Sequence, residues 1–303
     1  MTSEGKKILI LGGSGYIGRH LYGRLGPEKS VATFNSRPFE GGVKFDALTM
    51  SLSDLDITGG NFSHAVIMLG LTNIDACAKN EKESSKLNVL TIKKIIDELV
   101  ERDVFPIFTS SEMVFDGSKG QYVETDSINP KVMYGRQKAE IENHILKNVE
   151  KFIIMRLAKV YGSTPGDFSE LNQWYNAIHQ GAEIVCAHDY VTSPIHVDDL
   201  IDVMLSFINK ENSGIYHSGG SESLSRLEMF NVLLDEMNKA HSVVANMRSC
   251  SVDDIETIEG RPHDISMDSS KAILETGISP RDVRTSCREF VDELAREATK
   301  VSS

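Results

Sequence analysis

A tyrosine and a lysine stand four residues apart in the segment Tyr134-Gly135-Arg136-Gln137-Lys138. At the start of a helix this spacing places both side chains on one face, one turn apart. A free phenol has a pKa near ~10, and a neighbouring ammonium stabilises the phenolate. The pair therefore predicts proton transfer by Tyr134, although the same spacing also occurs on ordinary helix surfaces.

Glycines recur every third residue between an apolar run and an amphipathic segment, at Gly12, Gly15 and Gly18. A tight turn and the close approach of a pyrophosphate both require positions without side chains, and a helix N-terminus offers unpaired N–H groups to an anion. The pattern predicts a dinucleotide-binding loop, in which Tyr16 and Ile17 also belong to the cofactor site. An ordinary structural turn is the alternative.

The segment Asn35-Ser36-Arg37 follows the second apolar run, where an NAD-selecting site would place a carboxylate for the ribose hydroxyls. An amide, a hydroxyl and a guanidinium lack the charge that repels a 2′-phosphate, and they add donors suited to one. We therefore expect NADP(H) as the preferred cofactor and NAD(H) as the alternative. A solvent-exposed loop arginine is the simpler interpretation of Arg37.

The elements that must position these residues alternate along the first half of the chain. The apolar runs predict strands at 7–11, 31–34, 65–69, 105–109 and 152–156, and the amphipathic segments predict helices at 16–25, 83–102 and 134–149. This order predicts an α/β fold with a doubly wound parallel sheet of the Rossmann type, covered by helices on both faces.

After Tyr161 the alternation loosens, which predicts a smaller mixed α/β substrate domain. We expect the dinucleotide-binding domain to span 1–160, with 189–212 returning to it. The substrate domain would then comprise 161–188 and 213–303, closed by an amphipathic helix over 286–300.

Composition excludes several classes of partner. The 303 residues carry 32 Lys+Arg against 44 Asp+Glu, a formal charge of −12, and no basic block, which argues against nucleic-acid or membrane-surface binding. The longest apolar run, 65–71, is too short to span a bilayer. Four widely spaced cysteines and the absence of an HxxxH pattern predict no metal site, and a polar N-terminus favours a cytoplasmic location.

Further segments carry a family resemblance. The strand end Ser110-Ser111-Glu112-Met113-Val114-Phe115-Asp116-Gly117, the Tyr134–Lys138 helix and the glycine loop together resemble the extended short-chain dehydrogenases/reductases, most closely the dTDP-4-dehydrorhamnose reductase group. Matching segments continue in the family's order at Asn88, Arg156, 160–162, 193–200, 214–217, 261–262 and 267–271.

The resemblance implies a role for each matching residue. Ser111 would hydrogen-bond the substrate oxygen, Tyr134 would donate the proton, and Lys138 would tune the tyrosine and bind the cofactor ribose. The implied reaction is NADPH-dependent reduction of a keto group on a nucleotide-linked deoxysugar. The resemblance also implies three further cofactor residues. Asp46 would contact the adenine, and the backbone of Leu69 and Gly70 would lie under the cofactor.

Departures from the family pattern bear on the substrate. Related dehydratases have two carboxyl groups at the strand end, whereas this chain has only Glu112 there, which we expect to contact the substrate. Lys159 stands where the reductases have a tryptophan against the sugar, so it either meets a carboxylate or diphosphate or points outward. We expect Arg261 to hold the substrate diphosphate, with a surface ion pair as the alternative.

Two other functions remain open at this stage. One is an NAD-dependent nucleotide-sugar epimerase. The other is a regulatory module, because the beta subunit of methionine adenosyltransferase resembles the same reductases yet acts through its partner. The resemblance also implies a homodimer that pairs through helices flanking the sheet.

Overall fold

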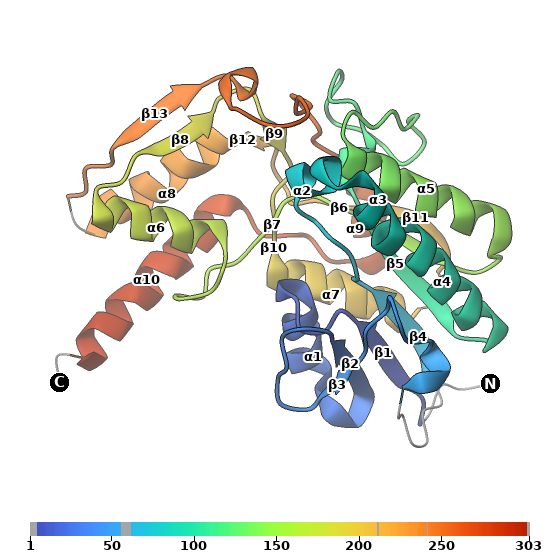
Figure 1. Cartoon of the computed structure of the whole chain (residues 1–303). Helices are drawn as coiled ribbons and strands as arrows, with labels where there is room; N and C mark the ends of the chain where they lie inside the picture. The colour runs from blue at the N-terminus through green and yellow to red at the C-terminus, as the bar shows by residue number, and fades with distance from the viewer. Residues whose placement is uncertain (1–4, 56–61, 211, 241, 302–303) are drawn as a thin grey trace. The chain divides into compact units, whose positions relative to one another are not determined.

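The computed structural model describes residues 5–55, 62–210, 212–240 and 242–301 (Figure 1). A seven-stranded sheet has the order β11-β6-β5-β4-β1-β2-β3. Its strands are β1 (Lys7–Leu11), β2 (Ser30–Phe34), β3 (Gly42–Lys44), β4 (Phe62–Ile67), β5 (Phe105–Ser111), β6 (Ile153–Leu157) and β11 (Gly214–Ser218). The pairings of β1 with β2 and β4, of β2 with β3 and of β4 with β5 are parallel. The expected Rossmann-type sheet is confirmed.

The strand order reverses at β1, which lies between β2 and β4. Leu11 pairs with Ile67, and Ile10 pairs with Ala32, so the segments that follow these three strands emerge at the same edge. Open α/β sheets bind ligands in the crevice at such a switch point. The predicted glycine loop directly follows β1.

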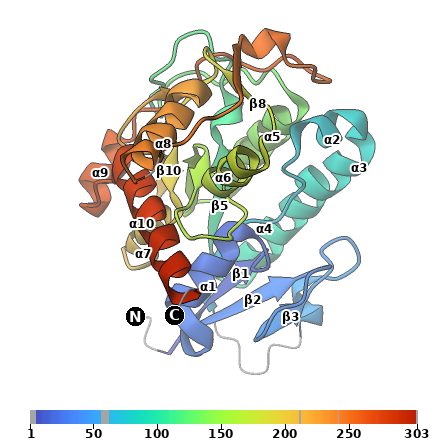
Figure 2. The same ribbon diagram turned by 90° about the vertical axis from the view of Figure 1, so that its left-hand side faces the viewer.

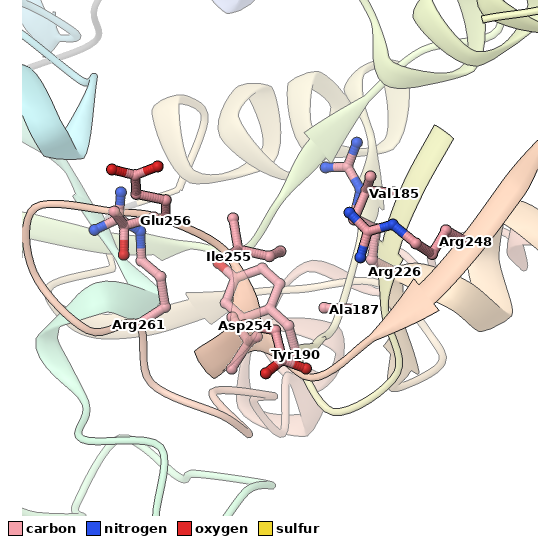
Figure 3. A pocket seen from close by; sticks show the side chains of 11 residues that line it. Val185, Ala187, Tyr190, Arg226, Arg248, Asp254, Ile255, Glu256 and Arg261 are labelled. Carbon is pink, nitrogen blue, oxygen red and sulfur yellow. The ribbon is translucent and has the colours of Figure 1, made fainter. Parts of the chain in front are cut away.

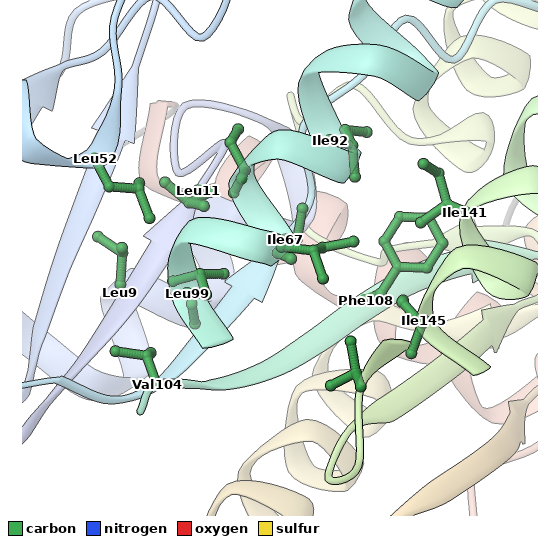
Figure 4. Packing of buried hydrophobic residues seen from close by; sticks show 14 of the residues in the cluster. Leu9, Leu11, Leu52, Ile67, Ile92, Leu99, Val104, Phe108, Ile141 and Ile145 are labelled. Atoms are coloured by element: carbon green, nitrogen blue, oxygen red, sulfur yellow. The ribbon is translucent and has the colours of Figure 1, made fainter. Parts of the chain in front are cut away.

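Helices α4 (Ile92–Glu101) and α5 (Met133–Asn148) cover one part of this sheet. Ile92 and Leu99 of α4 and Ile141 of α5 are buried against the strand residues Ile67 and Phe108 (Figure 4). Their spacing follows the helical period, so each helix turns one apolar stripe toward the sheet.

The helix expected over 83–102 is present, but a π-helical segment interrupts its α-helical geometry. The chain forms α3 (Glu81–Ser85), a π-helical segment η2 (Lys86–Thr91) and only then α4. A π turn holds an extra residue, and here it carries the buried Asn88. The Asn88 side chain donates to the Leu71 carbonyl at 2.9 Å and to Gln137 Oε1 at 2.7 Å, contacts that helical periodicity does not reveal.

Two compact units divide the described chain. The first comprises Met1–Val114, Ile128–Arg156 and Met204–Tyr216, and the second comprises Phe115–Ser127, Leu157–Val203 and His217–Ser303. The break after residue 156 lies near the expected one at 160. However, 115–127 belongs to the second unit, and the returning segment is 204–216 rather than 189–212.

Long-range backbone pairing explains why 115–127 joins the second unit. Tyr122 donates its N–H to the Ser266 carbonyl at 2.9 Å, and Asp264 donates to the Gly117 carbonyl at 3.2 Å. These partners lie more than a hundred residues apart in sequence, so local patterns could not predict them.

The second unit has its own core. Helices α6 (Glu170–Gln180), α8 (Arg226–Ala240) and α10 (Val283–Val301) contribute Trp174, Phe230 and Phe290 to it, and α8 and α10 are visible in Figure 2. Its short strands pair as β7 (Val160–Tyr161) with β10 (Ile195–His196), β9 (Val191–Thr192) with β12 (Leu224–Ser225), and β8 (Ile184–Ala187) with β13 (Met247–Cys250).

Within the described ranges, no helix combines the length and the apolar character needed to cross a membrane. The four cysteines, Cys77, Cys186, Cys250 and Cys287, are buried thiols that form no disulfide bond with one another.

Candidate active site

Ser111, Tyr134 and Lys138 come together at the end of β5 and the start of α5. The Ser111 hydroxyl and the Tyr134 phenol are hydrogen-bonded, and Ser111 Oγ also accepts the Met113 N–H at 3.2 Å. Lys138 Nζ lies 5.7 Å from the centroid of the Tyr134 ring. The structure thus groups the three residues that sequence spacing singled out.

Burial is the main influence on the acidity of Tyr134. Burial raises the pKa of the Tyr134 phenol above its usual value, the Ser111 hydrogen bond opposes this shift, and the Glu112 carboxylate adds to it. Tyr134 therefore keeps its proton at neutral pH, as a general acid must. Lys138 is not among the groups that shift this pKa, and its ammonium donates to the Thr109 carbonyl at 2.6 Å. The expected tuning of Tyr134 by Lys138 stays a prediction.

Lys138 is only 6% exposed. Its Nζ lies 4.6 Å from the centroid of the Phe108 ring. Burial lowers the pKa of Lys138 to about 8, and the Glu142 carboxylate partly opposes that shift. Desolvation disfavours the charged form of an amine, which accounts for the direction.

A buried charge network lies on the same helix and the neighbouring strands. Glu142 is 0% exposed and Arg156 is 3% exposed. Arg156 donates from its Nη2 to Glu142 Oε2 at 2.8 Å, while Ser110 Oγ donates to Glu142 Oε1 at 2.5 Å. Sequence reasoning missed Glu142, although a glutamate four residues after Lys138 must lie on the same helix face.

The glycine loop is built so tightly that side chains are excluded. Gly12 has φ +95°, and a Cβ there would lie 2.9 Å from the Met68 carbonyl oxygen. A Cβ on Gly18 would lie 2.5 Å from the Gly12 carbonyl oxygen. The Gly12 N–H donates to Thr33 Oγ1 at 3.1 Å, a contact that explains a buried threonine in an apolar strand.

A cavity of about 270 Å³ opens beside this loop. Its lining includes six residues expected to bind the cofactor: Gly12, Gly15, Asn35, Asp46, Leu69 and Gly70. It also includes residues that the sequence did not indicate, among them Ser14, Thr33, Phe45 and Leu87. Bare backbone at the helix start beside a cavity at the switch point fits a dinucleotide.

The other expected cofactor residues lie outside that lining. Gly18 is buried and acts through close packing of the loop. Tyr16 packs edge-on against His20, with ring centroids 4.9 Å apart, and Ile17 is half-buried next to it on α1 (Tyr16–Lys29). Ser36 and Arg37 are exposed beyond the end of β2.

The three expected substrate residues differ in their surroundings. Glu112 is buried in the short helix η3 (Glu112–Val114) and raises the pKa of Tyr134. In the second unit, Lys159 Nζ lies 3.8 Å from Glu170 Oε2, so a carboxylate of the protein itself faces Lys159. Arg261 Nη1 donates to the Glu259 carbonyl at 2.9 Å.

The second unit holds a larger cavity of about 610 Å³. Arg226, Arg248 and Arg261 all line it, with Arg226 and Arg248 on one side and Arg261 on the other (Figure 3). Its apolar lining includes Tyr190 and Ile255. Arg226 and Arg248 gave no signal in the sequence, because they are single arginines on separate elements.

Among the residues that the structure describes, no group of three or more histidines, cysteines or acids is placed to hold a metal ion.

A switch-point cavity with a glycine loop, together with the Ser111–Tyr134–Lys138 group, defines a Rossmann-fold protein of the extended short-chain dehydrogenase/reductase class. The family model described as RmlD substrate binding domain matches residues 6–296. The chain belongs to this family, closest to its dTDP-4-dehydrorhamnose reductase group.

Known proteins resemble the chain over nearly its whole length. A dTDP-4-dehydrorhamnose reductase of Aggregatibacter actinomycetemcomitans is 25% identical over 91% of this chain and 95% of its own length. The methionine adenosyltransferase 2 subunit beta of Xenopus tropicalis is 26% identical over 78% of this chain and 74% of its own. The structure of a Bacillus anthracis dTDP-4-dehydrorhamnose reductase in complex with NADP superposes with a TM-score of 0.81 at 19% identity, covering 95% of this chain and 99% of that one.

Proposed function

We propose that this protein is an NADPH-dependent ketoreductase acting on a keto group of a nucleotide-linked sugar. The observation that carries the proposal is the hydrogen-bonded Ser111–Tyr134 pair, with Lys138 one helical turn further on. NADP(H), when bound in the cavity beside the glycine loop, supplies the hydride. The kinship with dTDP-4-dehydrorhamnose reductases supports the same activity.

The chain's own residues account for the proton. As charge develops on the carbonyl oxygen, Tyr134 donates its phenolic proton to that oxygen, and Ser111 holds the oxygen by a hydrogen bond. A phenol with a raised pKa remains protonated until this moment. Lys138 would contact the cofactor ribose after its side chain leaves the Thr109 carbonyl, to which its ammonium donates at 2.6 Å.

The cofactor preference is part of the proposal. Asn35 lines the cavity at the end of β2, where a carboxylate would repel a 2′-phosphate. Arg37 follows in an exposed position that a phosphate can reach. Arg37→Ala should therefore weaken NADPH binding more than NADH binding, and an equal effect on both would count against the preference.

The larger cavity of the second unit suits the nucleotide diphosphate of the substrate. Three guanidiniums and two carboxylates, Asp254 and Glu256, are among its lining residues, and guanidiniums suit phosphate oxygens. Arg226 also pairs with Glu170 and Arg248 with Glu183, so a bound phosphate would share these two guanidiniums with the protein's own carboxylates. Tyr190 and Ile255 offer apolar surface to a base or a sugar. We propose that Arg261 binds the diphosphate from this cavity and that Glu112 contacts the sugar.

Lys159 already lies beside a carboxylate of the protein, that of Glu170. Glu170 contacts Arg226 at 2.5 Å as well as Lys159 at 3.8 Å, so two cations share one buried carboxylate. Lys159 would then meet a substrate carboxylate or diphosphate only by giving up its contact with Glu170.

A regulatory role is the second candidate. The 26% identity with a methionine adenosyltransferase 2 subunit beta favours it, and such a subunit would act through a protein partner. The epimerase alternative is weaker, because tightly held NAD suits an acid where Asn35 stands.

A cytoplasmic location and a homodimer stay predictions. Leu146 of α5 and Val100 of α4 are exposed apolar residues on helices expected to pair.

The proposal is tested by following NADPH oxidation with 4-keto sugars linked to dTDP, GDP, UDP and CDP. Turnover with one of them should be lost in Tyr134→Phe and kept in Tyr22→Phe, which removes an exposed phenol hydroxyl from α1 of the same unit. A sample that binds NADPH but reduces none of these sugars would refute the reductase, and tight capture of another protein would then favour the regulatory role.

A further inference from the structure

A lysine that the sequence did not single out contacts Asn35, one of the residues that line the expected cofactor cavity. The parallel register of β2 and β3 pairs Phe34 with Lys44, and both strands lie side by side in Figure 2. Lys44 Nζ donates to the Asn35 carbonyl oxygen at 2.8 Å and to Asn35 Oδ1 at 2.7 Å. Asn35 in turn lines the cavity of about 270 Å³.

These contacts fix the orientation of the Asn35 amide. An ammonium has three donors and no acceptor, so the side-chain atom that faces Lys44 must be the amide oxygen. The two N–H donors of the amide then remain for a ligand. A phosphate accepts hydrogen bonds only, whereas a ribose hydroxyl is best recognised by a protein acceptor, as a carboxylate provides.

The hydrogen bonds that Lys44 donates go to neutral acceptors and do not balance its positive charge. Both of its acceptors belong to Asn35 and are neutral, and among the described residues no carboxylate lies within ion-pair distance of its Nζ. Two of its three N–H bonds are used, and the third is available. Lys44 is also exposed, so an incoming dianion does not have to displace a buried group.

We propose that Lys44 and the Asn35 amide contribute, beside Arg37, to the receptor for the 2′-phosphate of NADP(H), with Lys44 as a second cation that favours the phosphorylated cofactor. This inference rests on the cofactor part of the proposed function. It does not depend on which sugar is reduced, or on whether any sugar is reduced.

The test compares two small probes that differ only in the 2′-phosphate, adenosine 2′,5′-bisphosphate and adenosine 5′-monophosphate, by calorimetric titration of the full chain. Wild type should bind the bisphosphate more tightly. Lys44→Met should weaken bisphosphate binding about tenfold or more and change monophosphate binding less than about twofold. Lys44→Arg, which keeps the charge, should retain most of the bisphosphate affinity.

Lys29→Met is the matched control, because it removes an exposed lysine in the last turn of α1, which does not line the cavity. It should leave both affinities unchanged. The inference is overturned if wild type does not distinguish the two probes, or if Lys44→Met weakens both equally, which would mean that Lys44 only supports the loop. Because neither probe needs a sugar substrate, a failed ketoreductase assay leaves this result intact.

Discussion

Replacing Lys138 by methionine should change how the stability of the protein depends on pH. The folded-state pKa of Lys138 is about 8, against 10.5 for an unperturbed lysine. Between these values the unfolded chain binds a proton that the folded chain does not, so the free energy of unfolding rises with pH in this window. Below pH 8 the destabilisation by the buried amine is fully present, and above pH 10.5 it is gone.

The size of the effect follows from the shift. A fall of the pKa from 10.5 to about 8 corresponds to about 3 kcal/mol of destabilisation when the amine is charged in the unfolded chain. Between pH 7 and pH 10, the wild type should gain about 2–3 kcal/mol relative to Lys138→Met. The variant also leaves the Thr109 carbonyl without its donor, but that loss does not vary with pH.

The assay is urea unfolding followed by far-ultraviolet circular dichroism at pH 7, 8, 9 and 10. Lys147→Met, which removes an exposed lysine of the same helix, controls for the loss of one charge. The free energy of unfolding of the wild type should rise relative to that of Lys138→Met as the pH rises. If this difference in free energy stayed constant, or if the wild type lost stability relative to the variant, the account of a buried, desolvated amine would be refuted.

Two further predictions test the packing around the site. Glu142→Gln and Arg156→Met should each lower the free energy of unfolding by about 3–5 kcal/mol, because each leaves a buried charge unpaired. If the free energies lost in the two single variants add up to the loss in the double variant, the two side chains do not interact and the prediction fails. Gly18→Ala should weaken NADPH binding at least about tenfold in a fluorescence titration, since its Cβ would meet a backbone oxygen at 2.5 Å. Gly23→Ala, whose Cβ meets nothing within 4 Å, should not weaken it, and equal affinities in the two variants would contradict the tight-loop argument.

Sequence patterns predicted those parts of the site that depend on local periodicity. The glycine loop follows β1 directly, and the four-residue spacing of Tyr134 and Lys138 guarantees a shared helix face. The strand before Ser111 was recognisable as an apolar run. In each case the information lies within about one turn or one strand of the residue concerned.

Other features depend on how separate elements pair, and they escaped prediction. Lys44 meets Asn35 only because β2 and β3 are in parallel register, and a three-residue strand has too little periodicity to be recognised. Arg156 meets Glu142 only because β6 lies beneath α5. The direction of the pKa shift of Tyr134 depends on its burial, which residue spacing does not encode.

The central claim is that Tyr134 completes a hydride reduction of a sugar ketone, and isotope transfer tests it most directly. NADPH carrying deuterium at both hydrogen positions of the nicotinamide C4 is mixed with an accepted nucleotide-linked 4-keto sugar, so that the label is transferred from either face, and the product is analysed by mass spectrometry in single-turnover experiments. The wild type should yield a sugar one mass unit heavier, and Tyr134→Phe should transfer the label about 10²- to 10⁴-fold more slowly at unchanged NADPH affinity. An unlabelled product, or transfer by Tyr134→Phe at the wild-type rate, would contradict the claim.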